Sequence, residues 1–131
     1  MPTATVAHNG GDRFSIAIRG HLILVDQPES DGGSDTGPSP TELFVASLAS
    51  CVAFYARRYL KRHNLPEQGL TVTAQAESGA RPSRVAGMTI ILTIPDGVPE
   101  DRCEALLAVA SHCTVHNTLR NPPEVLVRLA D

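Results

Sequence analysis

Three cysteines are the residues of this sequence best suited to chemistry: Cys51, Cys103 and Cys113. A thiolate is a nucleophile. For redox catalysis, nearby positive charge must favour the thiolate, and a second thiol must resolve the oxidised cysteine. A free cysteine can equally be a small buried packing residue, so both interpretations of Cys51 stay open. Cys103 lies within an apolar stripe that packing explains, whereas Cys113 lies at its end. Cys113 is therefore the better partner for Cys51.

A zinc site is a second interpretation of the same region. His112, Cys113 and His116, with Cys51 brought close, would supply thiolate and imidazole ligands, which suit zinc. The sequence has no paired CxxC or HExxH spacing, so we predict neither a metal nor a cofactor. The remaining histidines are interpreted as surface or turn residues: His8, His21 and His63.

A long helix is predicted around Cys51. Ser39 is a suitable N-cap, Pro40 fits the first helical position, and Glu42 completes a capping box. The helix is expected to end near His63-Asn64, where basic residues accumulate and a proline follows shortly. Its first four turns are apolar on nearly every side, which predicts a buried core helix. Serines interrupt it, and it falls short of the roughly 20 apolar residues that span a bilayer.

The position of each side chain around this helix limits what can face Cys51. At about 100° per residue, Phe44, Tyr55 and Arg58 lie within roughly 40° of Cys51. Glu42 lies on the opposite side, which favours the capping role. Arg19 closes an earlier strand, and its place in the sequence does not bring it near a cysteine.

The other elements predict an α+β fold with mostly antiparallel sheets in one domain, residues 1–131. A mobile loop is predicted for residues 27–38. A second helix is predicted from about Pro99, and beyond Cys113 we expect a loop or short helix. Expected strands cover residues 3–8, 13–19, 21–26, 70–78, 84–94 and 124–130. The stripe of the second helix contains Cys103, Leu106, Leu107, Ala110 and Cys113.

Composition excludes some classes of function. The net charge is -3, from 11 basic and 14 acidic residues, so no nucleic-acid or membrane partner is predicted. The N-terminal residues lack the pattern of a secretory signal. An odd number of cysteines without an extracellular context favours reduced thiols in the cytoplasm.

Three segments resemble the OsmC/Ohr family, the osmotically inducible and organic hydroperoxide resistance proteins. They are GPSPTELFVASLASC, CTVHNTL, and an Arg-Gly-His-Leu strand end followed by Asp26. The resemblance implies an α+β fold in which two subunits intertwine, with long central helices packed between sheets. It also implies a homodimer with active sites at the subunit interface.

The resemblance further implies a mechanism. Cys51 matches the peroxidatic cysteine, Cys113 the resolving cysteine, and Arg19 the arginine that stabilises the thiolate and orients the peroxide. An external dithiol, often protein-bound lipoyl, would reduce the disulfide. The family's glutamate ten residues before the cysteine is Thr41 here, with Glu42 one step later. The proline that usually follows the second cysteine is Thr114, and both features resemble the OsmC-like branch.

We therefore expect a cytoplasmic thiol peroxidase that reduces organic hydroperoxides. Phe44, Leu48 and Tyr55 would form an apolar substrate pocket beside Cys51. The alternative is a non-enzymatic dimer that binds a small apolar or thiol-reactive ligand at the subunit interface. Turnover separates the two, because a binding protein reacts at most stoichiometrically.

Overall fold

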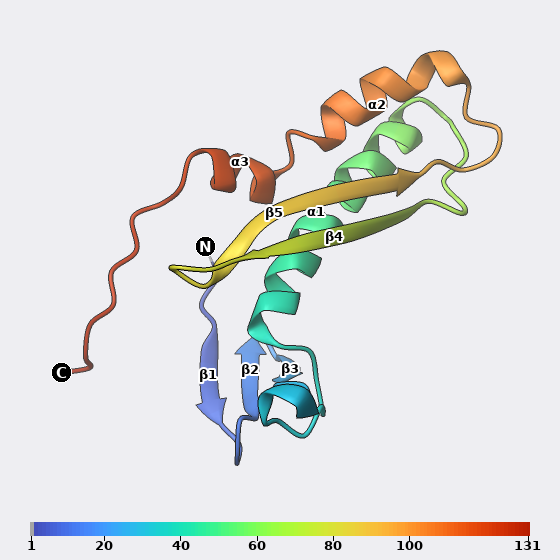
Figure 1. Cartoon of the computed structure of the whole chain (residues 1–131). Coiled ribbons are helices and arrows are strands. Elements are labelled where there is room, and N and C mark those ends of the chain that lie inside the picture. The colour runs from blue at the N-terminus through green and yellow to red at the C-terminus, as the bar shows by residue number, and fades with distance from the viewer. Residues whose placement is uncertain (1) are drawn as a thin grey trace. The chain divides into compact units, whose positions relative to one another are not determined.

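The computed structural model describes residues 2–131. These residues form two compact units, which divide between Val45 and Ala46. The α+β class, with antiparallel sheets and one long helix, is confirmed (Figure 1). The single domain over residues 1–131 stays a prediction.

The first unit contains a three-stranded antiparallel sheet. Its strands are β1 (Thr5–His8), β2 (Phe14–Ile18) and β3 (His21–Val25), in the order β1-β2-β3 (Figure 1). Arg19 and Gly20 connect β2 to β3 with φ values of +48° and +82°. Positive φ at both central residues is typical of a type I′ hairpin turn, whose twist matches the flanking strands. Arg19 and Gly20 therefore form the turn between the end of β2 and the start of β3.

The segment after β3, which we expected to be mobile, is held by the carboxylate of Asp26. This carboxylate accepts hydrogen bonds from the backbone N–H groups of Gln27 (2.7 Å), Ser34 (3.4 Å) and Thr36 (3.0 Å). It also accepts one from the Thr36 hydroxyl at 2.7 Å. The 3₁₀ turn η1 (Glu29–Asp31) lies within this segment. The sequence has no regular period here, yet one buried acceptor fixes its conformation.

Helix α1 (Pro40–Arg62) begins and ends as its sequence predicts. The Glu42 N–H donates to the Ser39 Oγ at 3.1 Å, and the Ser39 N–H donates to the Glu42 carboxylate at 2.9 Å. These reciprocal bonds are the expected capping box. At the other end, Asn64 has a φ of +54°, the left-handed conformation that stops a helix.

The second unit packs a hairpin and two shorter helices with α1. Its elements are β4 (Thr71–Gly79), β5 (Arg84–Thr93), the 3₁₀ turn η2 (Glu100–Arg102), α2 (Cys103–Ala110) and α3 (Thr114–Arg120) (Figure 1). The core joins one side of α1 to the helices that follow the hairpin. Its buried members are Leu48, Val52, Ala56, Tyr59, Leu60, Leu106, Ala110 and Cys113.

Only one stripe of α1 is buried, so the expectation of a helix covered on all sides is wrong for the single chain. Phe44 and Phe54 are 41% and 54% exposed. By length and composition alone, α1 is also capable of crossing a membrane, so the length argument against a span does not hold. Core helices of soluble proteins pass the same test, and one stripe of α1 packs in the core of the second unit.

The second predicted helix and the last predicted strand also need correction. Helix α2 ends at Ala110, and Cys113 precedes α3 instead of extending the stripe of α2. Leu107 is 48% exposed, so α2 buries a narrower face than its apolar stripe suggests, with Leu106 and Ala110 as its buried residues.

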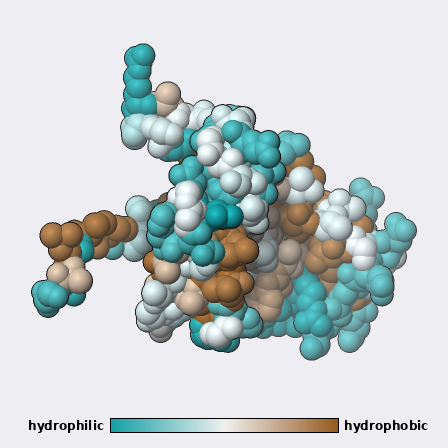
Figure 2. All heavy atoms as spheres, turned by 90° about the horizontal axis from the view of Figure 1, so that it is seen from below, coloured by the Kyte–Doolittle hydropathy of each residue, from teal (hydrophilic) through white to brown (hydrophobic). Residues whose placement is uncertain are grey.

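No strand forms at residues 124–130, although the alternation there predicts one. Figure 2 shows apolar side chains uncovered on this extended segment, and its four large apolar residues are 82% to 91% exposed. A strand needs a neighbour, and no other strand of the described residues pairs with this segment.

The Asp26 carboxylate makes the stability of the protein pH-dependent. Hydrogen bonds from Thr36, followed by those from Gln27 and Ser34, lower its pKa from 3.8 to about 2. Because the folded pKa lies below the unfolded one, the stabilisation is complete above about pH 4 and is lost as the pH falls toward about 2. We expect Asp26→Asn to lower the Tm at pH 7 by several degrees and to lower it far less at pH 2. Thermal unfolding followed by circular dichroism measures this.

The matched control is Asp12→Asn, which changes an exposed carboxylate in the β1–β2 turn. It should leave the Tm at pH 7 nearly unchanged. An Asp26→Asn protein as stable as the parent at pH 7 would show that the carboxylate does not hold the loop.

Candidate thiol redox site

The structure brings Cys51 and Cys113 together. Cys51 lies on α1 and is half-buried, whereas Cys113 is fully buried immediately before α3. Cys51 packs against the core cluster that contains Cys113, its side chain is near enough to raise the pKa of the Cys113 thiol, and neither cysteine is in a disulfide. The structure therefore places the two cysteines in the same core of the second unit, and their joining in a disulfide stays a prediction.

Cys113 has a structural task besides its contact with Cys51. It is the N-cap of α3, and its sulfur accepts a hydrogen bond from the backbone N–H of His116 at 3.4 Å. The capping bond and the core packing together fix the direction of this side chain. Its sulfur is thus held toward α1.

The two thiols differ in environment. Burial raises the pKa of the Cys113 thiol, and the neighbouring Cys51 side chain raises it further. The hydrogen bond from the His116 N–H lowers the pKa of this thiol, but by less than burial raises it. Cys113 is therefore a protonated thiol near neutral pH. Cys51 is the member of the pair that solvent reaches.

A hydrogen bond between α1 and α3 supports this arrangement. The hydroxyl groups of Tyr55 and Thr114 lie 2.9 Å apart. Tyr55 follows Cys51 by one turn, and Thr114 follows Cys113 directly. The bond therefore ties the two helices together beside the two sulfurs. Tyr55 was expected in a substrate pocket, and its contact with Thr114 was not predicted; the polar residue after Cys113 is the sequence signal for it.

Arg19 and Glu42 belong to the first unit, whereas both cysteines belong to the second. Arg19 is exposed in the β2–β3 turn, and no carboxylate of residues 2–131 forms an ion pair with it. Glu42 is engaged in the capping box. The structure therefore gives both residues local structural roles, and their catalytic roles stay predictions.

The three residues predicted to form a substrate pocket have different surroundings. Leu48 is buried in the core of the second unit, Phe44 is exposed, and Tyr55 lies between them in exposure. Their common role beside a substrate is thus a prediction that the single chain leaves open.

The zinc alternative has no support in the described part of the chain. Among residues 2–131, no three His, Cys, Asp or Glu side chains cluster closely enough to hold a metal ion. The His112 Nδ1 instead lies 2.7 Å from the carbonyl oxygen of Ala108 in its own helix. Cys103, the third thiol, lies 3.8 Å from the Pro99 carbonyl oxygen at the start of α2.

Comparisons with known proteins place the chain in a family. A long helix with a cysteine at its middle, a second cysteine beside it and antiparallel sheets define a two-thiol α+β protein of the OsmC type. The family model described as OsmC-like protein matches residues 32–128. The chain therefore belongs to the OsmC-like family.

Solved structures share the fold. A proposed osmotic-stress-induced and detoxification-response protein of Psychrobacter arcticus 273-4 is 25% identical, with a TM-score of 0.83 over 90% of this chain and 88% of that one. An OsmC-like protein of Mycoplasma pneumoniae is 16% identical, with a TM-score of 0.80 over 93% and 89%. The organic hydroperoxide resistance protein OsmC of Legionella pneumophila is 20% identical, with a TM-score of 0.67 over 92% and 89%. No curated protein matches the chain.

The different environments of the thiols predict different reactivity. We expect Cys113, as the only thiol of a Cys51→Ser, Cys103→Ser protein, to react slowly with iodoacetamide, because its thiolate is disfavoured by burial. The midpoint of its rate against pH should lie above the free-thiol value of about 8.5. Mass spectrometry of alkylated protein measures the rate.

The control is the Cys103→Ser, Cys113→Ser protein, in which Cys51 is the only thiol and should react faster near neutral pH. Both proteins should react alike in urea. A Cys113 midpoint at or below the free-thiol value would contradict the assignment.

Proposed function

We propose that this protein is a thiol peroxidase that reduces organic hydroperoxides through Cys51 and a Cys51–Cys113 disulfide. The observation that carries the proposal is the packing of Cys51 against the core cluster that contains Cys113, where the Cys51 side chain influences the pKa of the Cys113 thiol. One thiol of the pair is partly accessible, and the other is buried. A peroxide can reach the first thiol, and the second is a thiol with which its oxidised sulfur can condense.

In the first step the Cys51 thiolate attacks the terminal oxygen of the hydroperoxide. The O–O bond breaks, a sulfur–oxygen bond forms, and the alkoxide takes up a proton to leave as the alcohol. Cys51 is oxidised to the sulfenic acid while the peroxide is reduced. Because Cys113 is fully buried, a peroxide arriving from solvent meets Cys51 first.

In the second step the Cys113 sulfur attacks the sulfenic sulfur of Cys51. The disulfide forms, and the hydroxyl group leaves as water with the proton of the Cys113 thiol. The proton that the Cys113 thiol gives up as its sulfur attacks is thus the one that leaves in the water. An external dithiol, which can be a lipoylated protein, then gives two electrons and two protons and restores both thiols.

Arg19 is proposed as the guanidinium that favours the Cys51 thiolate and donates to the departing oxygen. The support is the family resemblance of its strand end, and Glu42, committed to the helix cap, is a weak candidate for its carboxylate partner. Phe44, Leu48 and Tyr55 are proposed to contact the alkyl group of the substrate.

The comparisons support this function at the level of the family. The similar protein of Legionella pneumophila is described as an organic hydroperoxide resistance protein and a redox protein. OhrB of Bacillus subtilis, 21% identical with a TM-score of 0.65, is likewise an organic hydroperoxide resistance protein. Three free cysteines are compatible with a reducing cytoplasm, where we place the activity.

Substitution of each cysteine tests the proposal. The parent protein should consume cumene hydroperoxide catalytically with a lipoamide reductant, and Cys51→Ser should lower turnover to background because no other thiol is both accessible and paired. Cys113→Ser should lose one equivalent of thiol and then stall as the sulfenic acid. Peroxide loss, free-thiol count and peptide mapping of the disulfide measure these outcomes.

Cys103→Ser is the matched control, since this thiol lies apart from the pair at the start of α2, and its turnover should equal that of the parent. Continued turnover by Cys51→Ser would reject the mechanism. Stoichiometric reaction of the parent without turnover would favour the non-enzymatic dimer that binds a thiol-reactive ligand.

We also propose that the protein is a homodimer. Phe44, Phe54 and the segment 122–131 expose large apolar side chains in the single chain, and isolated chains rarely leave such surface in water. The alternating pattern of residues 124–130 fits an added strand on the sheet of a second copy. This is the support for the intertwined arrangement that the family resemblance implies.

Val127→Pro tests the added strand. Proline cannot donate the N–H that a paired strand uses, so this substitution should shift the protein toward monomer, whereas Val127→Thr, which keeps the N–H and the β-branch, should stay dimeric. Light scattering coupled to size exclusion measures the mass. A monomeric parent protein, or a Val127→Pro protein that stays fully dimeric, would contradict the proposal.

A further inference from the structure

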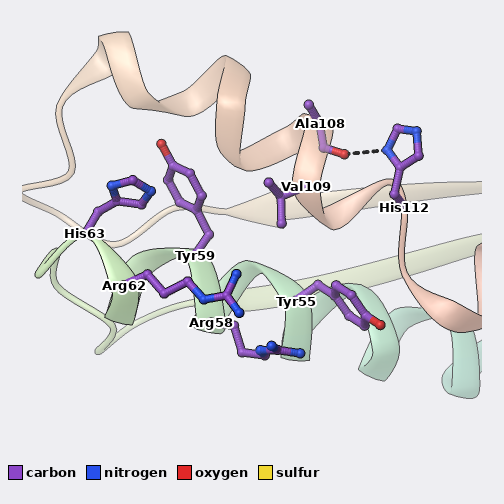
Figure 3. A pocket seen from close by; sticks show the side chains of 8 residues that line it. All are labelled: Tyr55, Arg58, Tyr59, Arg62, His63, Ala108, Val109 and His112. Carbon is purple, nitrogen blue, oxygen red and sulfur yellow. Dashed lines mark hydrogen bonds between the residues drawn. The ribbon is translucent and has the colours of Figure 1, made fainter.

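A groove between α1 and α2 lies beyond the two cysteines. It is a cavity of about 550 Å³, within the range of small-molecule sites. Figure 3 shows side chains from both helices around it, with Arg62 extending along the α1 side and Val109 directed from α2. Its lining residues are Tyr55, Arg58, Tyr59, Arg62, His63, Ala108, Val109 and His112.

Two guanidinium groups of this groove have no carboxylate partner. Arg58 and Arg62 are one helical turn apart, so both lie on the same face of α1. Within residues 2–131, neither forms an ion pair. The Arg58 guanidinium carbon lies 5.4 Å from the ring centre of Phe54 and 5.8 Å from that of Tyr55. Stacking on two rings orients this group and leaves its N–H donors available.

The histidine at the end of α1 contributes a further donor. Arg102 can only donate, so its contact of 3.2 Å with the Nδ1 of His63 makes that nitrogen the acceptor. The proton of a neutral His63 is then on Nε2. The ring of His63 is fixed by packing on Tyr59, with ring centres 4.3 Å apart. No acidic residue lines the groove, so its charged groups are all donors.

The remaining walls are apolar or aromatic. Tyr59 is buried, Tyr55 is held by its bond to Thr114, and Val109 is directed from the facing helix (Figure 3). We infer that this groove binds a small organic anion, whose carboxylate is held by Arg62, with Arg58 one turn away at the edge of the groove, and whose apolar body lies against Tyr59 and Val109. Planar guanidinium groups match carboxylate geometry in two parallel hydrogen bonds.

The helix dipole by itself explains only part of this arrangement. Cations are favoured near any helix C-terminus, and Arg57 and Lys61 occupy the same turns as the groove residues. Arg57 is paired with Glu67 on the surface, and neither Arg57 nor Lys61 lines the groove between the helices. The dipole does not account for a cavity with two unpaired guanidinium groups and an oriented imidazole.

The sequence supplies a specific probe of this groove. The chain has two tyrosines and no tryptophan, and both tyrosines line the cavity. Intrinsic tyrosine fluorescence therefore reports occupancy directly. We expect cyclohexanecarboxylate to change the fluorescence of the reduced full-length protein saturably, and the neutral cyclohexanecarboxamide, of nearly the same shape, to bind at least about tenfold more weakly, since it lacks the charge. Acetate and inorganic phosphate, which lack the apolar body, should also bind more weakly.

Two variants locate the binding. Arg62→Gln should weaken cyclohexanecarboxylate binding by about tenfold or more, while Lys61→Gln, the matched change outside the groove, should leave it unchanged. Circular dichroism and thermal melting establish that both variants fold. Equal binding of acid and amide, binding by phosphate as tight as by the carboxylate, unchanged binding in Arg62→Gln, or no saturable binding of the carboxylate would each overturn the inference.

This inference goes beyond the proposed peroxidase and does not depend on it. Binding is measured without peroxide and without reductant, and the Cys51→Ser protein should bind the carboxylate as the parent does. A protein that binds the carboxylate without peroxidase turnover would contradict only the proposed peroxidase. A protein that turns over peroxide without binding the carboxylate would contradict only this inference.

Discussion

Burial of one stripe of α1 fixes the direction of every other side chain on that helix. Leu48, Val52, Ala56 and Leu60 are all nearly inaccessible to solvent and belong to one core with α2 and Cys113. Once this stripe faces the core, the row beside it is determined by the period of 3.6 residues per turn. That row contains Cys51, Tyr55, Arg58 and Arg62. A nucleophilic thiol, a tyrosine bound to α3 and two unpaired cations therefore follow one another along a single line.

The same row explains why the site is built from residues far apart in sequence. Cys113 enters the core with α1 and α2, and its position before α3 places its sulfur against Cys51. The Tyr55–Thr114 bond then adds a direct link between the helices at 2.9 Å. Hydrophobic packing supplies the approximate placement, because it is strong but not directional. The hydrogen bonds define which atoms meet.

Local signals in the sequence were sufficient for the local structure. Ser39 and Glu42 predicted the start of α1 because a capping box needs only four consecutive residues, and the hairpin of β1 and β2 followed from turn chemistry and alternation. Cys113 was preferred to Cys103 because it was expected at the end of the apolar stripe of the second helix, and the structure places it instead at the cap of α3, in the core against which Cys51 packs. The Tyr55–Thr114 bond and the contacts of Asp26 were not predicted. They join residues that tertiary packing brings together, and no periodic pattern in the sequence indicates them.

Segment 124–130 shows a different limit of sequence reasoning. Its apolar and polar residues alternate as in a strand, but such a segment forms a strand only when another strand is available to pair with it. The single chain offers no such neighbour among its described strands, so the segment is extended and exposed. Likewise, apolar residues on nearly every side of α1 predicted a helix covered all round, but the single chain buries only one stripe of it.

The position of Cys113 as the cap of α3 links the oxidation state of the protein to its secondary structure. Helix α3 has seven residues, too few for a helix to persist in water without help from its surroundings. Its first turn depends on the hydrogen bond that the His116 N–H donates to the Cys113 sulfur. When that sulfur bonds covalently to another atom, its orientation is set by the new bond. Amide hydrogen exchange at His116 is thus a native reporter of thiol chemistry, readable without any label on the cysteines.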